Sequence, residues 1–108
     1  MRALLTYKRW KLKDGTDEDE LVALVRDEIA PHYRKLDGCV GLGLLGIADS
    51  RSYLAIQHWR SRAVRDATLS SEFYTSWFEA YRPILERWDQ LMDFEDEWEA
   101  EDVLGWKE

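Results

Sequence analysis

The sequence predicts a single α+β domain in which helical segments cover one face of a four-stranded antiparallel sheet. Its 108 residues leave room for one modest core and are too few for two. Apolar spacing switches along the chain between a period of two and a helical period, in the order strand, helix, strand, strand, helix, strand. Right-handed crossovers then place both helical segments on the same side of the sheet.

The first half of the chain is expected to form a strand, a helix and a second strand. Residues 1–12 alternate, and one face holds Leu4, Thr6, Lys8 and Trp10. Thr16 is expected to cap a helix that runs to about Leu36 and is kinked or restarted at Pro31, which lacks a backbone donor. Residues 39–47 are apolar on both faces, which is typical of a short buried strand.

The second half is expected to begin with a strand over residues 52–59, which is again apolar on both faces. Ser61 is positioned to cap a short helix. Ser71 is positioned to cap a longer one over residues 72–88, with an interruption at Pro83. Strand alternation also predicts that the last two residues of the strand point in opposite directions, His58 away from the helices and Trp59 toward them.

Residues 91–100 alternate as a half-buried strand. Its apolar side is expected to hold Met92, Phe94 and Trp98, and its solvent side Asp93, Glu95, Glu97 and Glu99. The charges of the first strand are all basic, so we predict cross-strand pairs between some of Lys8, Arg9 and Lys11 and some of Asp93, Glu95 and Glu97. The tail, about 101–108, keeps Val103, Leu104 and Trp106 and is apolar enough to dock.

The sheet face away from the helices is expected to be apolar, because the first three strands are apolar on both sides. Such a patch is larger than monomers usually leave in water. The natural cover is the same face of a second copy, which predicts a homodimer with two stacked sheets and the helices outside.

Composition excludes several classes of function. A formal charge of −7 argues against a nucleic-acid partner, which needs clustered Lys and Arg. One cysteine, Cys39, and two histidines are too few for a convincing metal cluster. No apolar run is long enough to span a bilayer, and no charged-then-apolar leader is found, so we expect no membrane association and a cytoplasmic location.

Several short motifs together resemble a known family over nearly the whole chain. They are Lys13-Asp14-Gly15, Leu36-Asp37-Gly38-Cys39-Val40-Gly41, His58-Trp59-Arg60-Ser61, the series Ala67, Leu69, Ser71 and Phe73, and Tyr81-Arg82-Pro83. The sequence is similar to the antibiotic biosynthesis monooxygenase-like family of the dimeric α+β barrel superfamily. The resemblance implies a ferredoxin-like βαββαβ domain over residues 1–108, with sheet order 4-1-3-2.

The resemblance also implies an aromatic pocket between the sheet and the helices of each subunit. Some members oxygenate polycyclic phenols with no metal or flavin, and others bind or degrade haem. Trp59 occupies the strand-end tryptophan position of the cofactor-free oxygenases, but the asparagine that they place on the same face falls here at Ala55. Trp59 is therefore either a catalytic residue or a plug between sheet and helices.

The haem-degrading branch matches less well. Its first-strand asparagine falls at Lys8, its helix tryptophan near Thr68, and its histidine at or beside Trp77. No histidine follows His58, so the last helix cannot ligate iron. We therefore expect no cofactor, and haem binding or degradation is the less favoured alternative.

The remaining candidate residues each have two interpretations. His32 lies on the inward stripe of the first helix, where an imidazole is either a base near neutral pH or a hydrogen-bonded core residue. Lys8 is either a binding group for an anionic substrate or an exposed lysine. Phe73, Trp77 and Tyr81 recur at helical spacing and line either the pocket or the core.

The leading hypothesis is an enzyme that carries out oxidation or proton transfer on an aromatic or polyketide-like substrate. The alternatives are a non-catalytic domain that binds a small aromatic or apolar ligand and a structural dimeric barrel with a filled core. The cavity separates the three: mixed polarity favours the enzyme, an apolar lining favours simple binding, and no cavity favours the structural role.

Overall fold

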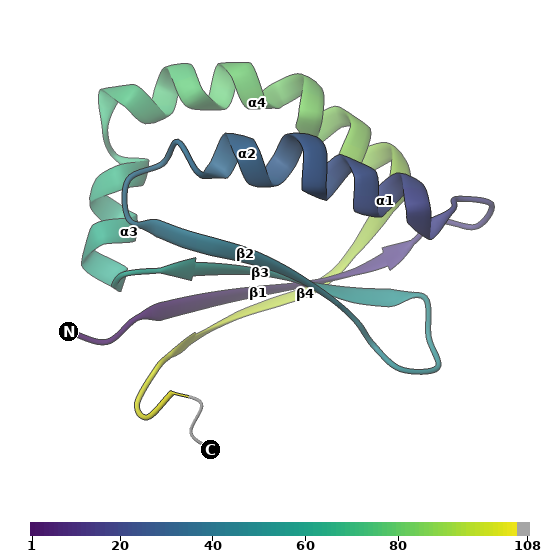
Figure 1. The fold of residues 1–108 in the computed structure, drawn as a ribbon, viewed down its shortest axis with the longest axis horizontal. Helices are drawn as coiled ribbons and strands as arrows, with labels where there is room; N and C mark the ends of the chain where they lie inside the picture. Colours follow the sequence, from purple (N-terminus) through teal and green to yellow (C-terminus); the bar gives the residue numbers. More distant parts are fainter. Residues whose placement is uncertain (106–108) are drawn as a thin grey trace.

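The computed structural model describes residues 1–105. Over this range the chain forms one antiparallel sheet in the order β2-β3-β1-β4, with every helix on one side of it (Figure 1). The α+β class and the 4-1-3-2 order predicted from the sequence are therefore confirmed. The elements are β1 (Leu4–Leu12), α1 (Glu18–Leu24), the π-helical turn η1 (Val25–Ile29), α2 (Ala30–Tyr33), β2 (Cys39–Gly46), β3 (Ser52–Trp59), α3 (Arg62–Leu69), α4 (Glu72–Leu91) and β4 (Met92–Glu101).

The first helical segment is continuous but widens before its proline. Its cap is Asp17 rather than the predicted Thr16: an Asp17 carboxylate oxygen accepts from the amide of Asp19 at 3.0 Å. Pro31 has no N–H to give to the preceding turn and its ring crowds the carbonyl four residues back. The π-helical turn η1 lies directly before this point, and its wider backbone makes room for the ring.

Two predicted caps in the second half are confirmed, and one predicted interruption is wrong. The hydroxyls of Ser61 and Ser71 accept from backbone amides at the starts of α3 and α4. Pro83, in contrast, lies inside a helix that runs unbroken from residue 72 to 91. The residue four positions earlier, Glu79, is exposed, so the carbonyl that the proline leaves without a donor faces water.

The turn between α2 and β2 requires glycine. Gly38 has a φ of 85°, in the left-handed region, and a Cβ at this position would collide with a methyl group of Val64 on α3. Gly38 thus lets α3 pack closely against the start of β2.

A bulge in β4 reverses the predicted faces of its second half. Arg9 pairs with Asp96 and Trp10 with Phe94, so Glu95 is an extra residue between them. Beyond the bulge, Trp98 moves to the sheet face away from the helices, and the side that faces the helices receives Glu97 and Glu99 instead. The predicted grouping of Trp98 with Met92 and Phe94 is therefore wrong, because a period of two holds only while no residue is inserted.

Opposite charges meet across β1 and β4, as predicted. Arg9 Nε lies 3.8 Å from a Glu95 carboxylate oxygen, and the register sets Lys8 opposite Glu97 and Lys11 opposite Asp93. The Arg9 side chain is about two-fifths exposed, so its ion pair with Glu95 contributes little to stability and acts mainly by fixing the strand register.

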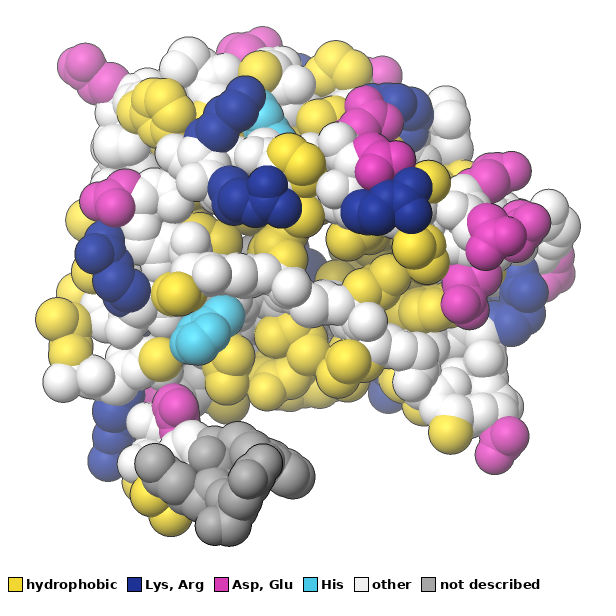
Figure 2. All heavy atoms as spheres, in the orientation of Figure 1, with side chains coloured by type: hydrophobic (Ala, Val, Ile, Leu, Met, Phe, Trp, Pro, Cys, Tyr) yellow, Lys and Arg dark blue, Asp and Glu magenta, His cyan; other side chains and the backbone are white. Residues whose placement is uncertain are grey.

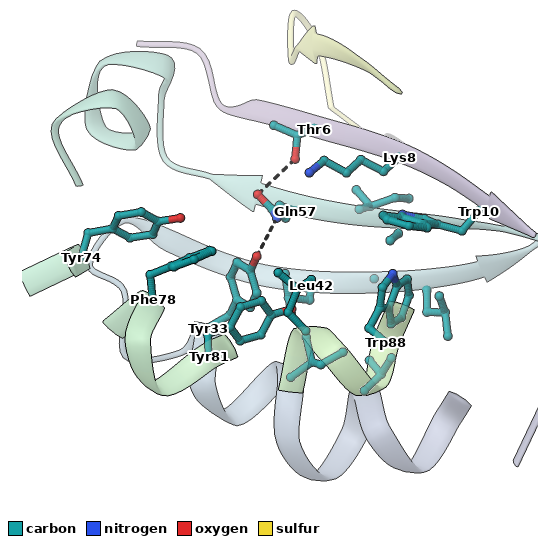
Figure 3. A pocket seen from close by; sticks show the side chains of 17 residues that line it. Thr6, Lys8, Trp10, Tyr33, Leu42, Gln57, Tyr74, Phe78, Tyr81 and Trp88 are labelled. Atoms are coloured by element: carbon teal, nitrogen blue, oxygen red, sulfur yellow. Dashed lines mark hydrogen bonds between the residues drawn. The ribbon is translucent and has the colours of Figure 1, made fainter. Parts of the chain in front are cut away.

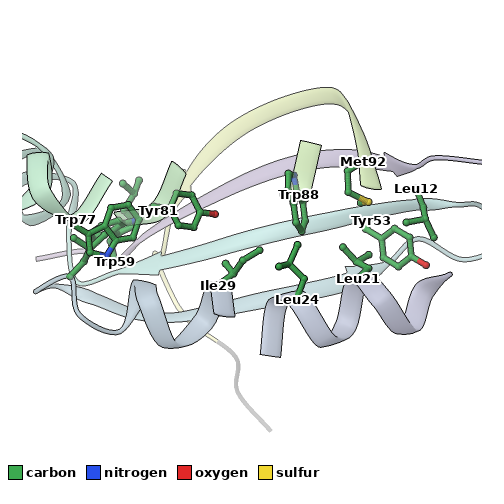
Figure 4. Close-up of a cluster of buried hydrophobic side chains, with 12 residues drawn as sticks. Leu12, Leu21, Leu24, Ile29, Tyr53, Trp59, Trp77, Tyr81, Trp88 and Met92 are labelled. Atoms are coloured by element: carbon green, nitrogen blue, oxygen red, sulfur yellow. The ribbon is translucent and has the colours of Figure 1, made fainter. Parts of the chain in front are cut away.

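The core lies between the sheet and the helices. Figure 4 shows its side chains in one row from Leu12 and Met92 at one end to Trp59 and Trp77 at the other. Trp59 is only 1% exposed and packs on the helix side, whereas its neighbour His58 is exposed, which confirms the predicted opposition. In the tail, Val103 and Leu104 are exposed rather than docked, and Trp106 lies outside the described residues.

The sheet face away from the helices carries exposed apolar side chains. Leu45 is 54% exposed and Trp98, stacked on Tyr7 at 5.5 Å, is 41% exposed. Figure 2 shows hydrophobic side chains gathered along the sheet side of the molecule, with no helix below them. Within residues 1–105, no helix combines the length and the apolar character needed to cross a bilayer.

Candidate functional site

Two connected hollows lie between the sheet and the helices. One, of about 220 Å³, runs beneath α4 and η1, and it opens between the helix layer and the sheet (Figure 2). The other, of about 410 Å³, lies toward α3 and the far end of β4. The two share five lining residues, Thr6, Lys8, Tyr33, Gln57 and Tyr74. They therefore form one cavity with two chambers.

We call the chamber beneath α4 and η1 the inner chamber and the one toward α3 the outer chamber. The inner chamber is lined mainly by aromatic and aliphatic side chains. Trp10 from β1 meets Trp88 from α4 edge to face at 5.4 Å, and Phe78 and Leu85 continue the helix wall. Leu44 and its neighbours on β2 form the floor. A lining of this kind binds flat apolar skeletons, because aromatic faces supply large contact areas in defined geometry.

A polar cluster centred on Gln57 borders both chambers. Figure 3 shows three of its members, Thr6, Gln57 and Tyr33. The indole Nε1 of Trp59 lies 3.1 Å from Gln57 Oε1. Since an indole N–H can only donate, its partner must be the carbonyl oxygen of the amide, which fixes the orientation of the side chain. Thr6 Oγ1 donates to the same oxygen at 3.3 Å, and Gln57 Nε2 donates to the Tyr33 hydroxyl at 3.2 Å.

This arrangement leaves donors facing the cavity. The carbonyl oxygen of Gln57 already accepts twice, while its Nε2 has a second N–H to give. The Tyr33 oxygen accepts from Gln57, so its own O–H is left to donate, either to the neighbouring Tyr81 hydroxyl or to a ligand. Burial raises the pKa of Tyr33 well above its ordinary value and that of Tyr81 to about 12. Both hydroxyls therefore keep their protons near neutral pH.

The outer chamber has a charged rim where α3 approaches β4. Arg65 donates to Glu99 at 2.7 Å, and Arg62 reaches the other Glu99 oxygen at 3.0 Å. The hydrogen bond from Arg65 holds the pKa of Glu99 below its ordinary value. Glu97 lies on the same rim, two residue pairs further along β4, opposite Lys8.

No family model and no curated protein matches this sequence. Solved structures do match in fold. A mutant of SnoaB, a cofactor-independent oxygenase from Streptomyces nogalater, superimposes with a TM-score of 0.72 at 17% identity, over 98% of both chains. HapK from Hahella chejuensis gives 0.66 at 14% identity, over 97% of this chain and 98% of its own. A candidate antibiotic biosynthesis monooxygenase from Chloroflexus aurantiacus J-10-fl gives 0.58 at 17% identity, over 97% of both.

This chain has the antibiotic biosynthesis monooxygenase-like fold. The resemblance seen in its sequence motifs is thereby confirmed for the architecture, which these comparisons share from end to end. At this level of identity the likeness establishes the fold alone, and the chemistry has to be argued from the residues of this chain.

Of the four substrate-binding residues predicted from the sequence, two line the cavity and two do not. Lys8 and Tyr81 line it. Phe73 is 52% exposed, and Trp77 is buried behind the cavity wall. In the first half of α4 the cavity is lined by the next residue along in each case, Tyr74 and Phe78, and further along by Tyr81, Leu85 and Trp88.

The two predicted catalytic residues occupy different places. Trp59 borders the outer chamber and reaches it through Gln57. His32 is buried outside both chambers and packs on Trp77 at 4.5 Å and on Tyr81 at 5.6 Å. Its Nε2 donates to the Trp77 carbonyl at 2.8 Å, and the Trp77 indole returns a bond of 2.8 Å to the His32 carbonyl. This reciprocal pair fastens α2 to α4.

Sequence reasoning missed Gln57. Ala55 lies in the cavity wall, at the position where the cofactor-free oxygenases carry asparagine, and the amide of this chain stands two residues later on the same face. The signal was available, because Gln57 is the one polar side chain among the helix-facing residues of β3, which are Tyr53, Ala55, Gln57 and Trp59. Among residues 1–105, no three His, Cys, Asp or Glu side chains gather closely enough to hold a metal ion.

Proposed function

We propose that this protein is an enzyme that oxygenates a planar aromatic or polyketide-like substrate with O₂ and without a bound cofactor. The observation that carries this proposal is the donor cluster of Gln57 and Tyr33 inside an aromatic cavity. A filled core would leave no room for a ligand, and an apolar cavity would bind one without directing chemistry to it.

The chemistry is that of a phenol whose keto tautomer carries a CH₂ group, as in anthrone. Loss of one C–H proton to water leaves an enolate, which gives one electron to O₂. The resulting radical and superoxide combine to a peroxide, and the peroxide loses water, so that CH₂ becomes C=O. One oxygen atom of O₂ enters the product and the other leaves as water.

The residues contribute by position and by charge stabilisation. Donors already oriented toward a developing oxyanion stabilise it without having to reorganise. Gln57 Nε2 and the Tyr33 hydroxyl would donate to the substrate oxygen as it becomes negative. Trp59 would act through Gln57, whose carbonyl it holds away from the substrate. The rings of Trp10 and Trp88 would hold the skeleton flat.

Anthrone and isotopically labelled O₂ test the proposal. We expect protein-dependent O₂ consumption, one labelled oxygen in anthraquinone, and loss of most of the rate in Gln57→Leu. Binding of anthrone with no rate above the protein-free reaction would assign the cavity to ligand binding alone, and the proposed oxygenation would be wrong.

We also propose that the active form is a homodimer whose subunits stack through the sheet face opposite the helices. The support is the apolar character of that face, including the exposed Leu45 and the Trp98–Tyr7 stack. Sedimentation at micromolar concentration should give twice the monomer mass, and a folded monomer there would refute this part of the proposal.

A further inference from the structure

Among residues 1–105, Lys8 is the cation of the cavity that has no counter-ion. It projects from β1 on the helix side and lines both chambers, and Figure 3 shows it beside Thr6 and Gln57. Its ammonium group makes no hydrogen bond or ion pair within residues 1–105. Half-buried charges usually have a partner, because removing them from water is unfavourable.

The carboxylates nearest to Lys8 do not neutralise it. Glu97 stands opposite in the register of β4 but lies beyond ion-pair distance. Glu99, two residue pairs further along, already pairs with Arg62 and Arg65. The other titratable or charged groups that line the cavity with Lys8 come from α2, α3 and α4: Tyr33, Arg65, Tyr74 and Tyr81. None of these can supply a negative charge near neutral pH.

The polar groups around Lys8 add donors and no free carbonyl acceptor. Gln57 offers its second amide N–H, Tyr33 offers its O–H, and the one side-chain carbonyl of the cluster is already occupied by Trp59 and Thr6. A neutral carbonyl oxygen can accept two hydrogen bonds and so satisfy these donors, but it would leave the charge of the ammonium uncompensated. An anionic oxygen would satisfy both.

We propose that Lys8, together with Gln57 and Tyr33, makes this cavity selective for the deprotonated oxygen of a planar aromatic ligand, a phenolate or an enolate. This inference rests on the proposed function for its choice of site and names the form in which the substrate is bound. Lys8 is then a specificity-determining residue: it draws the substrate into the electron-rich state that reacts with O₂.

The test uses 4-nitro-1-naphthol, which absorbs visible light only as its phenolate, and 1-nitronaphthalene, which has the same rings without the hydroxyl. Quenching of tryptophan fluorescence gives the affinity, and absorbance against pH gives the pKa of the bound dye. One charge-assisted hydrogen bond predicts phenolate binding about tenfold tighter than binding of 1-nitronaphthalene, and a bound-dye pKa lower by about one.

Lys8→Met should abolish both effects, and Lys11→Met, an exposed lysine on the opposite face of the same strand, should keep them. Lys8→Arg should retain the preference, and Glu97→Gln should enlarge it by removing the nearest competing carboxylate. If Lys8→Met does not fold, Lys8→Arg and Glu97→Gln test the anion selectivity in its place. Equal affinity for the two probes, or a preference that persists in Lys8→Met, would overturn the proposal.

These measurements separate the two hypotheses, because none of them requires turnover. If the naphtholate binds through Lys8 but anthrone is not oxidised, the proposed oxygenation fails and the anion selectivity stands. If anthrone is oxidised and Lys8 has no influence on the bound dye, the anion selectivity fails and the proposed oxygenation stands.

Discussion

Replacing Gln57 by leucine tests whether the polar cluster is a structural unit as well as a site. Leucine has a similar volume, but it can neither accept from Thr6 and Trp59 nor donate to Tyr33. Two of those groups, Thr6 and Tyr33, line the cavity and can bond water there. Trp59 also borders the outer chamber, but it is only 1% exposed, so its indole N–H has too little access to water to replace the lost partner.

The expected loss is therefore that of one orphaned donor rather than of three hydrogen bonds. Burying an unpaired N–H costs about 1–3 kcal/mol, and we expect Gln57→Leu to lower the free energy of unfolding by that amount. Urea denaturation followed by far-UV circular dichroism measures it, with all variants compared at one protomer concentration because a dimer's stability depends on concentration.

A double-mutant cycle identifies the cause. Trp59→Phe removes the donor itself, so adding it to Gln57→Leu should destabilise less than the sum of the two single changes, by about 1 kcal/mol. Strictly additive losses would mean that the two side chains act through packing alone. An unchanged stability in Gln57→Leu would refute the reasoning altogether.

Three further predictions follow from other contacts. His32→Gln should lower the melting temperature by opening the pair with Trp77, yet leave the pH profile of turnover unchanged; loss of one limb of that profile would support His32 as a base. Since Arg65 depresses the pKa of Glu99, their pairing stabilises the fold fully above the ordinary glutamate pKa and less as the pH falls through it. Glu99→Gln should therefore flatten stability against pH in that acidic range, and an unchanged slope would contradict the pairing. Leu45→Glu should give monomers in sedimentation, whereas an unaltered dimer would place the interface elsewhere.

The fold could be predicted because many weak local signals agree. The serine caps, the apolar periods and the opposed directions of His58 and Trp59 all follow from spacing within one element. Thr16 and Pro83 were misplaced because a cap can shift by one residue, and because an exposed helix face tolerates a proline.

The site was harder to predict, because its geometry depends on how elements meet. Phe73 and Tyr74 are both compatible with an apolar helix stripe, and only the angle of α4 over the sheet decides which one enters the cavity. Gln57 has no unusual neighbours in sequence. Its importance arises from Thr6, Tyr33 and Trp59, which come from β1, α2 and the end of β3.

The single extra residue in β4, Glu95, determines how changes in the length of this strand would affect the two faces of the sheet. Deleting Glu95 would leave Asp96 opposite Arg9 and Glu97 opposite Lys8, so β4 would alternate without a bulge while Trp98 stayed away from the helices and Glu97 stayed toward them. One codon lost at this point would thus remove the bulge and keep the acidic groups on the rim of the cavity. The bulge therefore lets β4 carry one residue more than its pairing with β1 needs, and a Glu95 deletion should keep both the acidic rim and the apolar face.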